Sequence, residues 1–477
     1  MKRYTLVLVL LLAAAPLAAQ TRREALLEYQ SRRRRAYTEF REDYRKACAD
    51  FMRKRWEAFR AEAPVPVPER KEPDRPVMRQ PDAPVIRTPK PIVPNRIVEL
   101  PEAPPEARPA PVATPTKIDA SRTCRFAFYG TECSVSLGPD QHVRLASRAE
   151  NSVADAWERI AGSYDRVAAE CSEMKEQLRL NDWGYYDLVR TLADAYCGRA
   201  TDESTLVQSF LMAEAGYKVR LARGRERLHL LLALDDRVYA RPYFRIGGQT
   251  FYLLDGSATG GQFSICNFSI PGERVLSLSM PEPPLLSDAP AAPAVRNDAQ
   301  DGISTTVTPN RNLLDFLEDY PPCYWNIYAS ARLSASVREQ LLPPLRRAIA
   351  GKGEYQAAAI LLHYLHRAFP YKTDDAQFGG ERTLFAEEMF FFPYSDCEDR
   401  SVLFVQLVGE LLQLKTVLLY YPNHIAAAVR FHGEAVGDYV SVGRERYTVC
   451  DPTYIGAEIG EAMPGLEQTP VEIIRID

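Results

Sequence analysis

Hydrophobic and polar positions change their rhythm several times along the 477 residues of the chain. A short apolar run comes first, then a stripe with helical spacing, then a proline-rich stretch. Two long regions follow in which strand and helix periodicities alternate, which is typical of folded α+β units. We therefore divide the chain into 1–20, a signal peptide; 21–62, a basic amphipathic helix; 63–118, a Pro-rich linker; 119–280, a first folded unit; 281–309, a second linker; and 310–477, a second folded unit.

The first folded unit carries both periodicities. Residues 124–136 alternate polar and apolar positions, as half-buried strands do. Apolar positions then recur at helical spacing over two long stretches, before short apolar runs return. The pattern predicts helices over 151–180 and 184–217, and strands over 219–221, 228–234 and 251–254.

The second folded unit has its clearest pattern in its last third. An apolar helix is predicted directly after residue 397, because its apolar positions lie three and four residues apart. Strand-like runs follow over 417–421, 424–429 and 447–451. A helix followed by strands again predicts an α+β fold. The apolar positions of the helix are Leu403, Phe404, Leu407, Val408, Leu411 and Leu412.

The N-terminal apolar run has the layout of an export signal. Lys2 and Arg3 form a cationic start, Leu6 to Ala15 is apolar, and small residues lead to Gln20. Ten apolar residues are too few to cross a bilayer comfortably, although an uncleaved anchor remains the alternative. We expect an exported protein that is periplasmic, extracellular or associated with the cell envelope, in an oxidising compartment.

Two features of the N-terminal region concern partners. Residues 21–62 hold 13 Lys/Arg against 8 Asp/Glu, densest at Arg32 to Arg35, with an aromatic stripe that includes Phe40 and Tyr44. The helix is either solvated and self-associating, or it contacts an anionic envelope surface. Residues 63–118 hold 16 of the 36 prolines, which predicts an extended spacer between this helix and the folded units.

Composition excludes several classes of function. The net charge of −4 excludes a globally basic nucleic-acid binder, and the single long apolar run excludes a polytopic membrane protein. Nine cysteines and six histidines occur without CxxC or HExxH spacing. We therefore expect no metal and no cofactor. His363 and His366 lie three apart on a predicted helix, without an evident third ligand, so a structural role is expected for both.

Three residues of the second unit form a catalytic pattern. Cys397 follows Asp396, a suitable helix N-cap, so the thiol lies at a helix N-terminus, which favours the thiolate. His424 opens a strand and Asp451 ends one, and each interval spans 27 positions. A thiolate nucleophile needs an imidazole to take its proton, and the imidazole needs a carboxylate to fix its tautomer. Cys397, His424 and Asp451 are therefore the candidate catalytic residues.

These motifs resemble a known family. Cys-Glu-Asp at 397–399 before an apolar helix, His424 at a strand start and Asp-Pro-Thr at 451–453 are similar to the transglutaminase-like core, whose architecture is papain-like. The resemblance covers roughly residues 350–460. It implies Cys397 as nucleophile, His424 as base and Asp451 as the orienting carboxylate. Bacterial members of this fold are often hydrolases.

The expected function follows from the pattern and the resemblance together. We expect an exported cysteine enzyme that acts on amide or peptide bonds of a protein or peptide substrate through an acyl-enzyme. It would be a peptidase or amidase if water accepts the acyl group, or a protein-glutamine acyltransferase if an amine does. The side chain that supports the oxyanion is open among His366, Gln377 and Glu387. The alternative is a non-catalytic, envelope-associated binding or assembly module.

The first unit echoes the second. His229 lies 195 positions before His424, and Asp255 lies 196 before Asp451. The preceding apolar helices match at an offset of 197, which places Ala200 opposite Cys397, with Cys197 three residues away. Near-constant offsets predict an internal duplication in which the first, degenerate copy kept the fold and lost the nucleophile.

The cysteines allow other interpretations in an oxidising compartment. Cys397 could pair with Cys450 as a structural cystine instead of acting as a nucleophile. Cys124 and Cys133 fit a cystine across a hairpin. Cys48 stands alone on the N-terminal helix, as a free thiol or an intermolecular link.

Overall fold

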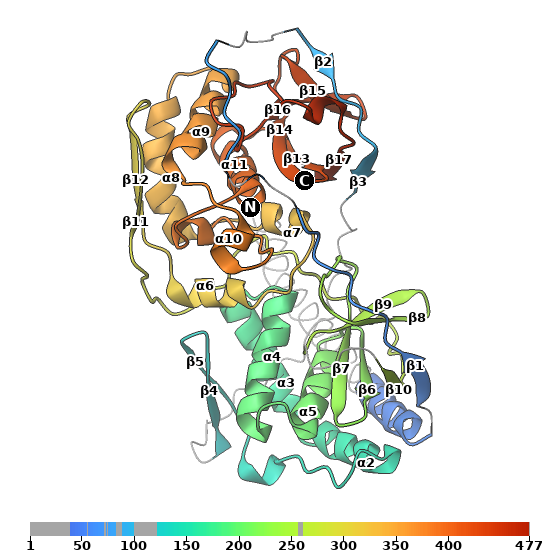
Figure 1. Cartoon of the computed structure of the whole chain (residues 1–477). Helices are drawn as coiled ribbons and strands as arrows, with labels where there is room; N and C mark the ends of the chain where they lie inside the picture. The colour runs from blue at the N-terminus through green and yellow to red at the C-terminus, as the bar shows by residue number, and fades with distance from the viewer. Residues whose placement is uncertain are drawn as a thin grey trace, which may run out of the picture.

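A computed structural model describes residues 39–54, 56–70, 73, 75–82, 88–99, 122–255 and 261–476. The predicted signal peptide, Arg32 to Arg35 and much of the Pro-rich stretch lie outside these residues. The chain forms two α+β lobes, drawn one above the other in Figure 1, with the N-terminal segment running along both. None of the helices in the described ranges is long and apolar enough to span a bilayer.

The first lobe packs four helices against a sheet and a separate hairpin. The predicted helix 151–180 is broken at Gly162, and the helix 184–217 is broken at Gly198, whose φ of +96° suits glycine. The predicted strands are present. Its elements are β4 (Cys124–Phe128), β5 (Thr131–Val135), η2 (Pro139–Gln141), α2 (Glu150–Ala161), α3 (Asp165–Gln177), α4 (Asp182–Cys197), α5 (Asp202–Glu214), β6 (Val219–Arg223), β7 (Leu228–Ala233), β8 (Tyr243–Ile246), β9 (Gln249–Leu253) and β10 (Gln262–Cys266).

The second lobe has a larger sheet, which packs against the long helix that begins at Cys397. This helix and the predicted strands are confirmed. The elements are β11 (Ala294–Asp298), β12 (Ile303–Val307), α6 (Arg311–Glu318), α7 (Trp325–Ser330), α8 (Ala335–Ile349), α9 (Glu354–Ala368), α10 (Asp374–Phe378), η3 (Glu388–Phe390), α11 (Cys397–Leu412), β13 (Thr416–Tyr421), β14 (His424–Val429), β15 (Asp438–Val442), β16 (Glu445–Cys450), η4 (Leu466–Gln468) and β17 (Glu472–Arg475).

The two main sheets share one topology. In the first lobe the strand order is β10-β6-β7-β9-β8, and in the second it is β17-β13-β14-β16-β15. All these neighbours are antiparallel, and each set follows a helix, α5 or α11, in the same sequence order. The fifth strand along the chain thus returns to the far side of the first strand in both lobes.

The N-terminal segment completes both sheets. In the first lobe β1 (Glu57–Arg60) pairs with β10, and Glu62 bridges to Tyr243 on the opposite edge. In the second, β2 (Lys90–Pro91) pairs with β15 and β3 (Arg96–Val98) pairs with β17. Five residue steps from Pro91 to Arg96 span at most about 17 Å. The two edges of each sheet must therefore lie close together, so both sheets are strongly curved.

In the part that the structure describes, this arrangement corrects the prediction of a spacer over 63–118. Pro91 occupies an edge strand, where its missing N–H is tolerated. The predicted helix over 21–62 is also wrong at its C-terminal end. Among the described residues it covers 39–52, and the chain then turns into β1.

The described part of the basic helix is held by the first lobe and does not project from it. Arg41 and Arg45 donate to Glu214 and Asp165, and Arg53 donates to carboxylates of α2. Tyr44 and Met52 are buried in the core. These contacts contradict a separate solvated helix.

The second linker, predicted over 281–309, also contains structure. The hairpin of β11 and β12 packs on α8 and α9, with Ile303 and Val307 buried. Asp298 is buried and accepts from Arg367 of α9 at 2.6 and 2.7 Å. This stretch therefore belongs to the second lobe.

All nine cysteines are free thiols in the structure. Cys124 and Cys133 do lie on one hairpin, as predicted, but they face Val135 and Phe126 and not each other. Cys397 and Cys450 are separate buried thiols, and Cys48 lies in the core of the first lobe. The cystine interpretations therefore have no counterpart in this structure.

Candidate functional site

Cys397 is the first residue of α11. Asp396 precedes it in extended conformation as the N-cap, and Asp399 accepts the Asp396 N–H at 3.4 Å, as in a capping box. The apolar face of α11 packs on β13 and β14, which fixes the helix start against the sheet. The Cys397 Sγ accepts the N–H of Ile425 at 3.2 Å and donates to Glu398 at 3.3 Å. Cys397 as a whole is 1% exposed.

His424 is placed by a tight hairpin. Tyr421 of β13 pairs with His424 of β14, so two residues, 422 and 423, make the turn. The next residue, Ile425, carries the N–H that reaches the Cys397 sulfur, so the register of β14 brings the imidazole and the thiol to the same end of the sheet. Of the small residues that follow in β14, Ala427 is buried in the core shared with α11, and Ala426 and Ala428 are buried on the opposite face of the sheet.

Asp451 follows β16 directly. Its Oδ2 lies 2.8 Å from His424 Nε2, and its Oδ1 accepts the N–H groups of Thr453 and Tyr454 at 2.9 and 3.1 Å. Burial alone would raise the pKa of Asp451, but the charge of His424 and these hydrogen bonds hold it below its usual value. The carboxylate therefore stays ionised beside the imidazole.

This geometry fixes the chemistry that the histidine can perform. Since Asp451 takes the Nε2–H, Nδ1 is the basic nitrogen of the neutral ring. The structure thus joins His424 to Asp451 directly and brings Cys397 to the neighbouring residue of β14. A thiol, an imidazole and an ionised carboxylate in this order can transfer the thiol proton.

The three side chains considered as supports for the oxyanion each have other contacts. Glu387 accepts the N–H and the hydroxyl of Ser334 at 2.9 and 2.7 Å, at the start of α8. Gln377 donates to the carbonyl of Tyr394 at 3.3 Å. His366 contacts the Asp451 carbonyl through Nε2 at 3.0 Å and accepts the Gly456 N–H through Nδ1 at 3.3 Å. His366 therefore positions the loop of Asp451.

The burial of His366 predicts a pH-dependent stability. Burial lowers the pKa of His366 to about 4, below the ordinary 6.5. The unfolded chain takes up a proton near pH 6.5 and the folded one only near 4, so stability is lost as the pH falls through this window. From pH 7 to pH 5 this loss is about 2 kcal/mol, at about 1.4 kcal/mol per pKa unit.

The measurement is the free energy of unfolding at both pH values, for the natural protein and His366→Gln. The variant should lack the His366 part of the pH dependence. Burial raises the pKa of Glu387 and of Glu388 to about 7, and these groups act in the opposite direction in both proteins, so the difference between the proteins isolates His366. Equal pH dependence in the two proteins would contradict the assignment.

Arg70 reaches the site from the N-terminal segment. Its guanidinium pairs with Glu398, whose other oxygen accepts the Cys397 thiol, and it also donates to Glu381 at 2.8 Å. The side chains of Arg70 and Glu398 are 2% and 0% exposed. Burial would raise the pKa of Glu398, but Arg70 and further hydrogen bonds lower it. Arg70 thus neutralises a charge next to the thiol.

A buried acidic cluster surrounds this ion pair. Asp374, Asp396 and Glu398 each have an oxygen within 4.8 Å of the others. Burial and the charges of Glu398 and Asp399 raise the pKa of Asp374 to about 10, so it is protonated at neutral pH. Within this cluster, Arg70 balances the charge of Glu398.

Arg400 connects the two loops of the site. It lies one helical turn after Cys397, is buried, and donates to the carbonyls of Phe369 and Pro452, at 2.5 and 3.4 Å, and to the Ser395 hydroxyl at 3.3 Å. Pro452 follows Asp451 and Ser395 precedes Cys397 by two. Arg400 therefore holds the nucleophile and the carboxylate loop together.

The first lobe has a related arrangement without a thiol. His229 Nδ1 lies 3.0 Å from Asp255 Oδ2, and Asp255 lies two residues after the end of β9, whereas Asp451 comes directly after β16. Asp202, and not Ala200, is the first residue of α5 and so corresponds to Cys397. Its Oδ1 accepts the N–H of Leu228 from β7 at 2.7 Å, much as the Cys397 sulfur accepts from β14.

Searches against protein-family models, curated proteins and solved structures find no match to this chain. The fold and the site thus define the protein as a two-lobed α+β protein with a buried cysteine beside a histidine–aspartate pair in its second lobe.

Proposed function

We propose that the second lobe is a cysteine-nucleophile enzyme that acts on amide or peptide bonds of a protein or peptide substrate. The observation that carries this proposal is the hydrogen bond between His424 Nε2 and Asp451 Oδ2. The residue after His424, Ile425, donates its N–H to the Cys397 sulfur. A structural thiol needs no such pair. The transglutaminase-like resemblance points to the same three residues.

The proposed reaction has two steps. His424 Nδ1 takes the Cys397 proton as the sulfur bonds to the carbonyl carbon, and then gives it to the departing amine as the C–N bond breaks. The product is a thioester on Cys397. Water or a second amine then attacks the thioester, with His424 taking its proton and returning it to the sulfur. Backbone N–H groups at the start of α11 suit the negative oxygen of each intermediate.

A second candidate function is a non-catalytic binding or assembly module. The observation that favours it is the near-complete burial of Cys397, which a substrate must reach before any reaction. A non-catalytic role is also favoured for the first lobe, because Asp202 occupies the helix start at which a nucleophile would be required. We propose that the first lobe is a degenerate copy of the second, on the shared strand order and the His229–Asp255 pair.

Location and surface contact remain proposals from the sequence. We propose an exported protein, on the signal-like residues 1–20. Arg41, Arg45 and Arg53 form ion pairs with carboxylates of the first lobe. We therefore propose that Arg32 to Arg35 would make any contact with an anionic envelope surface.

The test is brief treatment of the natural protein with iodoacetamide near neutral pH, followed by peptide mapping. We expect one fast adduct, on Cys397, because an activated thiolate alkylates faster than buried neutral thiols. Cys450, equally buried and directly before Asp451 at the end of β16, is the internal control. Cys397→Ala should remove the fast adduct. Alkylation of Cys397 no faster than that of Cys450 would favour the binding module.

A further inference from the structure

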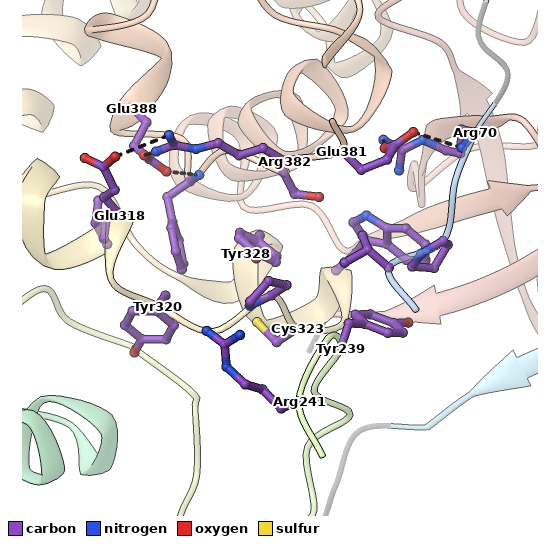
Figure 2. A pocket seen from close by; sticks show the side chains of 17 residues that line it. Arg70, Tyr239, Arg241, Glu318, Tyr320, Cys323, Tyr328, Glu381, Arg382 and Glu388 are labelled. Carbon is purple, nitrogen blue, oxygen red and sulfur yellow. Dashed lines mark hydrogen bonds and ion pairs between the residues drawn. The ribbon is translucent and has the colours of Figure 1, made fainter. Parts of the chain in front are cut away.

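A cavity of about 370 Å³ lies where the two lobes and the N-terminal segment meet. Tyr239 and Arg241 line it from the first lobe, Val67, Pro68 and Arg70 line it from the N-terminal segment, and the remaining walls come from the second lobe. Figure 2 shows Arg241 extending into the cavity from below. This volume is in the range of sites that hold small organic molecules.

The walls of the cavity combine aromatic rings with arginines. Tyr239, Tyr320, Trp325 and Tyr328 supply the rings. Such rings offer apolar surface to a ligand and leave hydroxyl and indole groups for polar contacts. The cavity therefore suits a ligand with a compact apolar body.

Two of the three arginines in the cavity have carboxylate partners. Arg70 pairs with Glu381 and Glu398, and Arg382 donates to Glu388 at 2.7 Å. Figure 2 shows the Arg70–Glu381 and Arg382–Glu388 pairs at opposite ends of the cavity. Their charges are balanced before any ligand binds.

Arg241 differs from the other two. Among the described residues its side chain forms no ion pair, and its one side-chain hydrogen bond goes to the carbonyl of Ala240 at 3.3 Å. Its Nε is covered by protein atoms, so the terminal Nη groups are the donors that Arg241 can offer to a ligand in the cavity. Arg241 is therefore the one arginine of this lining whose charge no carboxylate of the described residues balances.

We propose that this cavity binds a small organic monocarboxylate with an aromatic or branched apolar body. The carboxylate would accept from the two terminal Nη groups of Arg241 in a two-pronged geometry that guanidinium favours, while the apolar body packs on the tyrosines and Trp325. Glu318, Glu381 and Glu388 in the same lining disfavour a multiply charged anion. This site does not depend on the proposed chemistry at Cys397.

The test is calorimetric titration of the full chain with N-acetylphenylalanine and with its neutral amide. We expect the acid to bind and the amide to bind roughly 10- to 100-fold more weakly, which is the range for a charge-assisted contact. Arg241→Gln should weaken acid binding by a similar factor. Arg225→Gln, an exposed arginine of the same lobe, should leave it unchanged.

Three results would overturn the proposal. They are equal binding of acid and amide, no binding of the acid up to about 10 mM, and binding of inorganic phosphate as tightly as the acid. Arg241→Lys keeps the positive charge and provides a second test if the glutamine variant does not fold. The lysine variant should bind the acid more tightly than the amide, and equal affinities would also count against the site.

Discussion

Replacing His424 by alanine is expected to lower the rate at which an activated ester acylates Cys397 by roughly 10²- to 10⁴-fold. The imidazole is the group placed to take the thiol proton, and Asp451 holds it in the tautomer with Nδ1 basic. Without it the thiol must ionise on its own, beside the carboxylate of Glu398. The measurement is the rate of appearance of the acyl adduct by mass spectrometry at pH 7.

His363 provides the matched control for this variant. It lies on α9, half-buried, and its nearest carboxylate is Glu458 at 4.0 Å. His363→Ala should therefore change the acylation rate by less than about twofold relative to the natural protein, because substitutions away from the site have small effects. A similar fall in both variants would mean that His424 acts through the fold and not on the thiol.

Replacing Arg70 by glutamine is expected to lower the free energy of unfolding by about 3–5 kcal/mol. The substitution leaves Glu398 as an uncompensated carboxylate that has no contact with solvent. It also removes the side-chain bonds from the N-terminal segment to Glu381 and to Glu398 of α11, while the backbone bond to Glu381 remains. Denaturant titration of the variant and the natural protein measures the difference.

Two further variants show whether burial is the cause. Arg53 pairs with Asp155 and Glu158, but it is 25% exposed, so Arg53→Gln should cost under about 1 kcal/mol. Adding Glu398→Gln to Arg70→Gln removes the stranded charge and should restore much of the lost stability. Equal costs for Arg70→Gln and Arg53→Gln, or no recovery in the double variant, would contradict this account of the ion pair.

Local patterns were enough to predict the elements of the site. The apolar spacing after residue 397 identified α11, and short apolar runs identified β13, β14 and β16. These features depend on neighbours in sequence, and an antiparallel sheet then brings successive strand ends together. His424 and Asp451 meet for this reason.

The N-terminal segment could not be placed in this way. Its strands are two to four residues long and pair with partners that lie far away in sequence, and prolines obscure them. Arg70 and Glu398 are 328 positions apart, so no local pattern connects them. The helix offset of 197 placed Ala200 opposite Cys397, two residues before α5 begins at Asp202. The offset of 195 between His229 and His424 leads to Asp202 itself.

The most direct measurement of the central claim follows the acyl-enzyme itself. The natural protein and Cys397→Ser are mixed with a p-nitrophenyl ester of a short acyl peptide, quenched at intervals and mapped by mass spectrometry. The account predicts an acyl group on Cys397 that appears in a burst. The acyl group should then disappear as water, or an added amine acceptor, attacks the thioester. A stable adduct, or one that forms equally in Cys397→Ser, would contradict it.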